Sequence, residues 1–203
     1  MATQITATTE LQAINTMLSF IGEAPVSSIT GNIGTDVAVA KQILDETSLS
    51  VQNQGWFFNR DLEVTLTRDT NNKVPLETNC VALEPSAPYQ YQYSYTIRNG
   101  FLYDLKNHTD VFTTAPVQVD KTMIQQFEHI PEYARRYITV KAARRFAARY
   151  IGADSLVKLA TLDEQEAHVQ FEQADSRAMD ANILKDEYNM NYIVNRGYKR
   201  SSR

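Results

Sequence analysis

The fold is decided by a stretch that begins with TELQAINTMLSFIGEAP, residues 9–25, and ends with GWFF, residues 55–58. Its first apolar residues recur at intervals of three and four positions, the spacing of one buried helix face: Leu11, Ile14, Met17, Leu18 and Ile21. Thr9 and Gln12 stand three positions apart at the start of this face, which predicts a capping box. Gly22, followed by Pro25, predicts the end of the helix.

A second helix is predicted after a connector of residues 25–35. Thr35 or Asp36 is its expected N-cap. Its apolar face consists of five residues: Val37, Ala40, Ile43, Leu44 and Val51. Gly55 is expected to end this region, and the aromatic residues 56–58 follow at once. Because each such ring can bury about 150–250 Å², we expect them to fix the helices against the next part of the chain.

The middle of the chain has the patterns of antiparallel strands. Leu62, Val64 and Leu66 alternate with polar residues, which predicts a half-buried strand. Asn99 and Gly100 predict a two-residue hairpin turn, because both tolerate positive φ. The apolar residues around this turn extend the pattern to a small antiparallel sheet of about four strands or more.

Tyrosine occupies every second position in one part of this region: Tyr89, Tyr91, Tyr93 and Tyr95, followed by Ile97. The alternation predicts a strand with one tyrosine face. Such a face suits a sheet packed on a core, a stacking platform for a sugar or a base, or a subunit contact. Packing or a subunit contact is the favoured interpretation, because tyrosine combines an apolar ring with a polar tip.

Two more helices are predicted in the last third of the chain. Ile130 and Pro131 open the first of them. One of its sides is apolar and contains Ile138, Ala142, Ala143, Phe146 and Tyr150. The opposite side is basic and contains Lys141, Arg144 and Arg145. Asp154 or Ser155 caps the last helix, whose acidic composition favours ion pairing or solvation of the basic side over phosphate binding.

Length and composition exclude several classes of protein. A chain of 203 residues with a net charge of -4 fits a soluble globular protein of one or two domains. No apolar run approaches the ~20 residues of a membrane span, and residues 1–8 lack the pattern of a signal peptide, so we expect folding in a cytoplasm. The single cysteine, Cys80, cannot form an internal disulfide and is expected to be a buried free thiol.

The residues of a catalytic site are not indicated either. His108, His129 and His168 lack metal-ligand spacing. Gly31 and Gly34 are not followed by the lysine and hydroxyl of a phosphate-binding loop. The carboxylates of the last helix lie on a face expected to be exposed, where their pKa values are not driven apart for acid and base catalysis. We therefore expect no enzymatic activity, no cofactor and no metal site.

Together these patterns predict an α+β protein. A helical bundle of about four helices is expected from residues 1–58 and 123–188. A small antiparallel β domain is expected as an insertion at residues 59–122, and residues 189–203 are expected to form a C-terminal tail.

Two blocks of the chain resemble the tail tubular protein A family, the adaptor or gatekeeper proteins of T7-like short-tailed phages. The first block contains IGEAPV at residues 21–26 and GWFFN at residues 55–59. The second is HIPEYARRYITVKAARRFAARYIGA at residues 129–153. The two blocks occur in the family's order, whereas the middle of the chain, from about residue 70 to residue 122, carries little that matches.

The resemblance implies a structural virion protein that is assembled in the host cytoplasm and located in the tail. Proteins of this family form a ring of twelve subunits below the portal protein. The ring carries the tail nozzle, a partner similar to tail tubular protein B, and leaves a central channel through which DNA passes without specific binding. No contact with a membrane is implied.

Two candidate contact regions follow from this resemblance. The C-terminal tail combines aromatic and basic residues, as interface anchors do, and is the expected portal contact through Tyr192, Arg196, Tyr198 and Arg200. The tyrosine strand is the expected contact with a neighbouring subunit or with the nozzle through Tyr91, Tyr93 and Tyr95.

Two other classes of function stay open at this point. A tail-associated hydrolase of glycan or peptidoglycan would need paired carboxylates in a cleft. A nucleic-acid-binding module would use the arginines between Arg135 and Arg149, and its affinity would fall steeply with salt.

Overall fold

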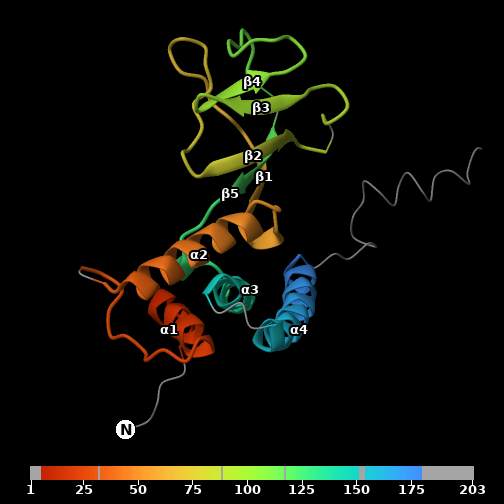
Figure 1. Cartoon of the computed structure of the whole chain (residues 1–203). Coiled ribbons are helices and arrows are strands. Elements are labelled where there is room, and N and C mark those ends of the chain that lie inside the picture. The colour runs from red at the N-terminus through yellow and green to blue at the C-terminus, as the bar shows by residue number, and fades with distance from the viewer. Residues whose placement is uncertain (1–5, 32, 88, 117, 151–153, 180–203) are drawn as a thin grey trace, which may run out of the picture.

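The structure is a computed structural model that describes residues 6–31, 33–87, 89–116, 118–150 and 154–179. Its helices gather at one end of the molecule and its strands at the other (Figure 1). The mixture of four helices and two small antiparallel sheets in this part of the chain confirms the predicted α+β class. No helix of the described residues is long and apolar enough to cross a membrane.

The first two helices are α1, Glu10–Phe20, and α2, Thr35–Gln52. The predicted capping box of α1 is confirmed, since the Gln12 N–H donates to Thr9 Oγ1 at 3.2 Å and the Thr9 N–H donates to Gln12 Oε1 at 2.9 Å. The predicted side-chain cap of α2 is wrong. Gly34 takes the N-cap position there without a side-chain hydrogen bond, and Thr35 is already helical. Glycine is tolerated at an N-cap because it reaches the extended conformation at little cost.

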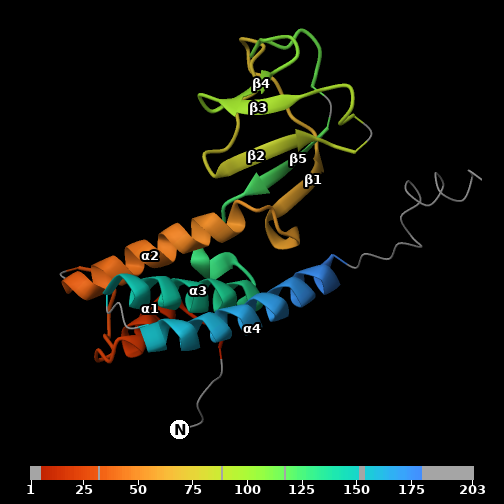
Figure 2. The same ribbon diagram turned by 45° about the vertical axis from the view of Figure 1, so that its right-hand side comes forward.

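The last two helices are α3, Glu132–Tyr150, and α4, Asp154–Ala178. Figures 1 and 2 place α3 between the first two helices on one side and α4 on the other. The largest fully buried side chains of the core come from all four helices and include Ile14, Met17, Ile43, Phe146 and Phe171. Complete burial of one such side chain favours the folded state by about 1.5–3 kcal/mol.

Four of the five residues predicted for the apolar side of α3 are buried: Ile138, Ala142, Ala143 and Phe146. Tyr150, the fifth, ends the helix and is exposed, although its ring centroid lies 5.0 Å from that of Phe146. Its hydroxyl donates to the carboxylate of Asp36 on α2. The last turn of α3 is therefore held to the start of α2 by a polar contact.

Three strands form the sheet nearer the helices, in the order β1-β5-β2, with both neighbouring pairs antiparallel. They are β1, Arg60–Val64, β2, Cys80–Pro85, and β5, Val119–Met123. The predicted alternation fails at Leu62, which is 54% exposed, because the register shifts between Asp61 and Val64, where Glu63 has a positive φ of 54°. Cys80 is a buried free thiol as predicted, and burial raises its pKa.

The second sheet is the hairpin of β3, Tyr95–Arg98, and β4, Phe101–Asp104. The turn predicted at Asn99 and Gly100 is confirmed, with φ values of 51° and 77°. Positive φ at both central residues gives a turn whose twist matches that of the paired strands. The single predicted sheet is thus two sheets.

The predicted tyrosine strand is wrong over most of its length. Of the four tyrosines, only Tyr95 belongs to β3, and residues 89–92 form turns. The N–H groups of Gln92 and Tyr93 both donate to the carbonyl of Tyr89, at 2.9 and 3.1 Å, and thus make local hydrogen bonds instead of ladder bonds. Alternation of side chains along the sequence does not place them on one face once the backbone turns.

The aromatic residues after α2 contact α4. The ring centroid of Trp56 lies 4.2 Å from that of Phe171, and the Phe58 centroid lies 6.5 Å from it. Phe57, which opens a short 3-10 helix at Phe57–Asn59, is exposed, but its N–H donates to the carboxylate of Asp175 on α4. The residues expected to fix the helices against the next part of the chain therefore pack on α4.

Candidate interaction surfaces

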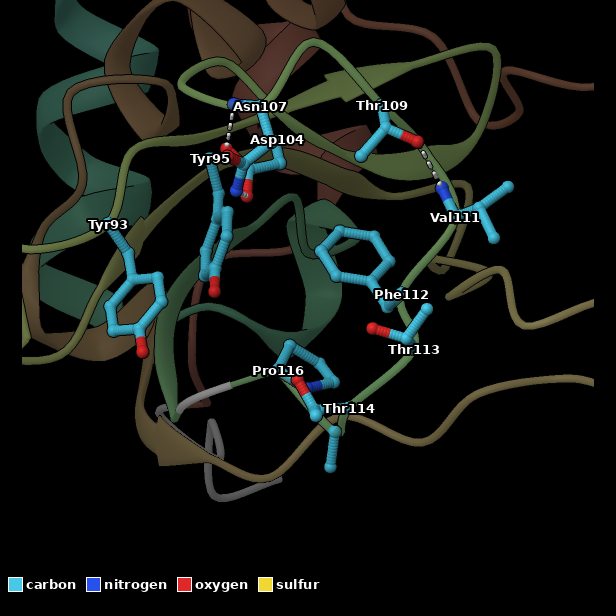
Figure 3. A pocket seen from close by; sticks show the side chains of 11 residues that line it. Tyr93, Tyr95, Asp104, Asn107, Thr109, Val111, Phe112, Thr113, Thr114 and Pro116 are labelled. Atoms are coloured by element: carbon cyan, nitrogen blue, oxygen red, sulfur yellow. Dashed lines mark hydrogen bonds between the residues drawn. The ribbon is translucent and has the colours of Figure 1, made fainter.

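A cavity of about 340 Å³ lies beside the β3–β4 hairpin and is seen from close by in Figure 3. Figure 1 shows that this hairpin is the sheet farther from the helices. It is bounded by the residues around the start of β3, by the end of β4 and by the segment 107–116. Its aromatic and apolar lining includes Tyr93, Tyr95, Phe112 and Pro116. Thr109, Thr113 and Thr114 belong to the same lining.

The aromatic side chains of the cavity form a continuous row. The ring centroids of Tyr93 and Tyr95 are 5.8 Å apart at an interplanar angle of 32°, and those of Tyr95 and Phe112 are 6.1 Å apart at 78°. Tyr95 and Phe112 belong to the small core of the strand region, together with Leu102 and Val119. Two of the three rings are therefore held rigidly by core packing.

Asp104 is the charged residue of this lining, and it is buried. Its carboxylate accepts hydrogen bonds from the backbone N–H groups of Lys106 and Asn107, at 2.8 and 3.0 Å, and from Asn107 Nδ2 at 2.8 Å, the bond drawn in Figure 3. Burial alone raises the pKa of Asp104, but these hydrogen bonds and the nearby Lys106 charge outweigh it and hold the pKa below its usual value. The carboxylate is thus ionised at neutral pH.

The three tyrosines predicted as a contact have different environments. Tyr91 is 92% exposed, Tyr93 is 37% exposed on the rim of the cavity, and Tyr95 is buried in its wall. The structure therefore brings Tyr93 and Tyr95 together and leaves Tyr91 out of the cavity. The predicted tail residues Tyr192, Arg196, Tyr198 and Arg200 lie outside the described part of the chain.

A second surface is the outer side of α4. Three apolar side chains are exposed there, by 61%, 62% and 50%: Leu159, Leu162 and Val169. Their spacing of three and seven positions places them along one stripe. The buried residues of the same helix, Ala160, Ala167 and Phe171, lie on its other side. A groove of about 580 Å³ between α3 and α4 reaches this stripe at Val169.

The helical periodicity of α4 contains a signal for this stripe, although the prediction for this helix used only its cap and its acidic composition. Residues 159, 162 and 169 point in the direction opposite to 160, 167 and 171 on a helical projection, so α4 has two apolar sides. The acidic residues between the two apolar sides made the helix look uniformly polar outside its core side. Exposed apolar residues that form one patch mark contact sites more often than isolated ones do.

The basic side of α3 is largely engaged by the chain itself. Arg144 forms an ion pair with Glu164 of α4, Arg145 donates to Thr47 Oγ1 at 3.1 Å, and Arg149 pairs with Glu46. Arg135 donates to three carbonyl groups, of Thr8, Glu128 and Ile130. This arrangement favours the ion-paired interpretation of the basic side over a phosphate-binding one.

No group of three His, Cys, Asp or Glu side chains that could hold a metal ion occurs in the described part of the chain. The sequence model of the family described as tail tubular protein matches residues 11–181. No curated protein gives a match to the chain.

Proposed function

The chain belongs to the tail tubular protein family, a structural component of the phage virion tail, and we propose that it is the tail adaptor. In this proposal twelve copies form a ring that joins the portal protein to the tail nozzle and leaves a central channel for DNA. The family match carries the proposal, because it covers nearly all of the helical core and the strand region.

The exposed stripe of α4 supports ring formation. Subunits of a closed ring contact each other head to tail, so each copy needs two different faces directed away from each other. Because α3 separates α4 from α1 and α2, the stripe of Leu159, Leu162 and Val169 faces away from the other helices. A neighbouring copy would remove these side chains from water, and each buried CH₂ group adds about 0.8 kcal/mol.

The two ends of the ring would use other parts of the chain. In the proposal the tail at residues 189–203 contacts the portal through Tyr192, Arg196, Tyr198 and Arg200. The strand region, treated as an inserted domain at residues 59–122, contacts the nozzle or a neighbour through the predicted set Tyr91, Tyr93 and Tyr95, of which Tyr91 and Tyr93 offer exposed surface and the buried Tyr95 supports Tyr93 from below. Residues 1–58 and 123–188 then form the domain that builds the ring.

Passage of DNA requires that the channel bind phosphates weakly. Each phosphate neutralised by a lysine or arginine adds salt-dependent affinity, which would slow the exit of DNA. The net charge of -4 and the engagement of Arg144, Arg145 and Arg149 by partners within the chain suit this requirement.

The mass of the protein in solution tests the proposal. Light scattering at physiological salt should give a defined complex containing twelve copies when the cognate portal protein is added. Absence of any association with the portal across a range of salt concentrations would refute the adaptor role.

Deletion of residues 195–203 should abolish portal binding, and unchanged binding would refute the assignment of the tail.

Two single substitutions test the subunit and nozzle contacts. Leu162→Ser should weaken ring assembly, whereas Leu62→Ser, which changes a similarly exposed leucine on β1, should leave it unchanged. Equal assembly of the two variants would exclude the α4 stripe as the subunit contact. Assembly of Tyr93→Ser tails at the wild-type yield would exclude the tyrosine contact.

A further inference from the structure

The cavity of the strand region combines aromatic walls with a buried charge. Two of its rings, Tyr95 and Phe112, belong to the small core, and Tyr93 remains partly exposed on the rim. Its lining also contains a buried carboxylate, Asp104. The rings of Tyr95 and Phe112 pack edge to face against each other, and both line the cavity; Figure 3 shows Asp104 and Asn107 towards one end of the lining and Pro116 towards the other.

The negative charge of Asp104 is not neutralised by an ion pair among the described residues. The nearest basic residue in sequence, Lys106, directs its Nζ to the carbonyl of Gln92 at 3.3 Å. The hydrogen bonds that the carboxylate accepts come from its own turn, at Lys106 and Asn107. These bonds fix the position of the carboxylate but leave a net negative charge inside the cavity wall.

The chemistry of this lining selects the ligand. An anion would be repelled by Asp104, and a purely apolar side chain would add nothing to the hydrogen bonds and the nearby Lys106 charge that now stabilise the carboxylate. A cation gains from both features, because aromatic faces attract positive charge and the carboxylate supplies the opposite charge. Among cationic side chains, a guanidinium group stacks flat on rings and is more weakly hydrated than an ammonium group. Thr113 and Thr114 of the lining carry hydroxyl groups of a type that can accept its N–H groups, whereas the Thr109 hydroxyl accepts from the Val111 N–H at 3.1 Å.

We propose that this cavity binds the guanidinium group of an arginine side chain presented by a partner protein. The partner is another component of the phage tail, and this identification rests on the proposed function. The binding of a guanidinium group does not rest on it, because the site is contained in a single copy of the chain. The cavity then gives the strand region a specific anchoring point for a basic partner.

The direct test is a titration of the full chain with N-acetyl-arginine amide, followed by two-dimensional NMR of the backbone amides. N-acetyl-citrulline amide, which has the same shape without the charge, is the matched control ligand. Arginine amide should shift the resonances of Asn107, Thr113 and Thr114, with a dissociation constant on the order of millimolar. Citrulline amide should bind at least about tenfold more weakly, since it lacks the charge that Asp104 and the rings attract.

Variants on the rim supply the second arm of the test. Tyr93→Ala should weaken binding of arginine amide about fivefold by removing one aromatic wall. Tyr91→Ala, which changes a neighbouring tyrosine outside the cavity, should not weaken it. Tyr93 is not among the buried residues of the strand core, so we expect Tyr93→Ala to fold, and its amide spectrum without ligand checks this. Equal binding of arginine and citrulline, or equal binding by Tyr93→Ala and the unchanged protein, would overturn the proposal.

The outcome is independent of the adaptor assay. If arginine amide binds and no complex with the portal forms, the cavity keeps its ligand and the proposed function fails. If the portal complex forms and arginine amide leaves the spectrum unchanged, the adaptor role stands and the proposed binding of a guanidinium group fails.

Discussion

The side-chain amide of Gln52 and the backbone of Gln125 hydrogen-bond each other in both directions. Gln52 Nε2 donates to the Gln125 carbonyl at 3.0 Å, and the Gln125 N–H donates to Gln52 Oε1 at 2.8 Å. Gln52 is the last residue of α2 and is fully buried, and Gln125 follows the end of β5. The pair therefore joins the end of a helix to the point where the chain returns from the strands.

Substitution of Gln52 by leucine should destabilise the protein by about 1–3 kcal/mol, because it leaves the N–H and carbonyl of Gln125 without these partners. Gln42→Leu is the matched control, since Gln42 lies on the exposed side of the same helix and donates to Glu46 one turn later. Urea unfolding measures both free energies. If Gln42→Leu lowered the free energy of unfolding as much as Gln52→Leu, the role assigned to the hydrogen bonds between Gln52 and Gln125 would be contradicted.

Substitution of Gly55 by alanine should destabilise the protein more than substitution of Gly22 by alanine. Both glycines have positive φ, 74° and 80°, so each alanine carries the cost of a left-handed conformation, about 1–2 kcal/mol. At Gly55 the added Cβ would also lie 3.2 Å from Thr122 Oγ1, whereas at Gly22 no atom lies within 4 Å. Thermal unfolding of the two variants compares them, and equal shifts in Tm would show that Thr122 moves aside freely.

Alkaline pH should destabilise the protein partly through Tyr133. Burial, with the charge and hydrogen bond of Asp175, raises the pKa of Tyr133 to about 12. Because the unfolded tyrosine ionises near pH 10 and the folded one does not, this contribution to stability is intact below pH 10 and is lost as the pH rises towards 12. Tyr133→Phe, which cannot ionise, should lose less stability than the unchanged protein between pH 9 and about pH 11 in urea unfolding. If both proteins lost the same free energy of unfolding over this pH range, Tyr133 would not be a source of the alkaline destabilisation.

Acid should remove the contribution of Asp104. Its pKa is lowered in the folded state, so its contribution is complete above the ordinary value of 3.8 and is lost as the pH falls through the folded-state pKa. The difference in unfolding free energy between the unchanged protein and Asp104→Asn should therefore be constant from about pH 5 to pH 8 and shrink below pH 4. A difference that stays the same at pH 3 would show that the charge of Asp104 does not contribute.

Features set by a few neighbouring residues could be predicted from the sequence. The capping box of Thr9 and Gln12, the turn at Asn99 and Gly100 and the apolar side of α3 depend on local geometry, which the sequence states directly. The α+β class follows from the same periodicities.

Features set by contacts between distant residues could not be predicted. The row of tyrosines has the period of a strand, yet local hydrogen bonds to the Tyr89 carbonyl turn the chain before Tyr95. The cavity forms because the chain brings Phe112 and Pro116 next to Tyr95. No pattern in the sequence indicates that these segments lie side by side. The second apolar side of α4 is different: a helical projection of the sequence would have shown it, but the acidic composition of the helix directed attention to ion pairing and solvation.

The strands leave and re-enter the helical bundle at one place. Arg60 at the start of β1 is paired with Thr122 near the end of β5, and Asn59 Nδ2 donates to the carbonyls of both Gln52 and Met123, at 2.8 and 3.0 Å. The segment between these residues is therefore an insertion whose two ends lie side by side. Such an insertion can be replaced by a longer, shorter or differently shaped segment without separating the end of α2 from the start of the chain's return to the helices. Evolution could refit the strand region to a new partner while the helices stay unchanged.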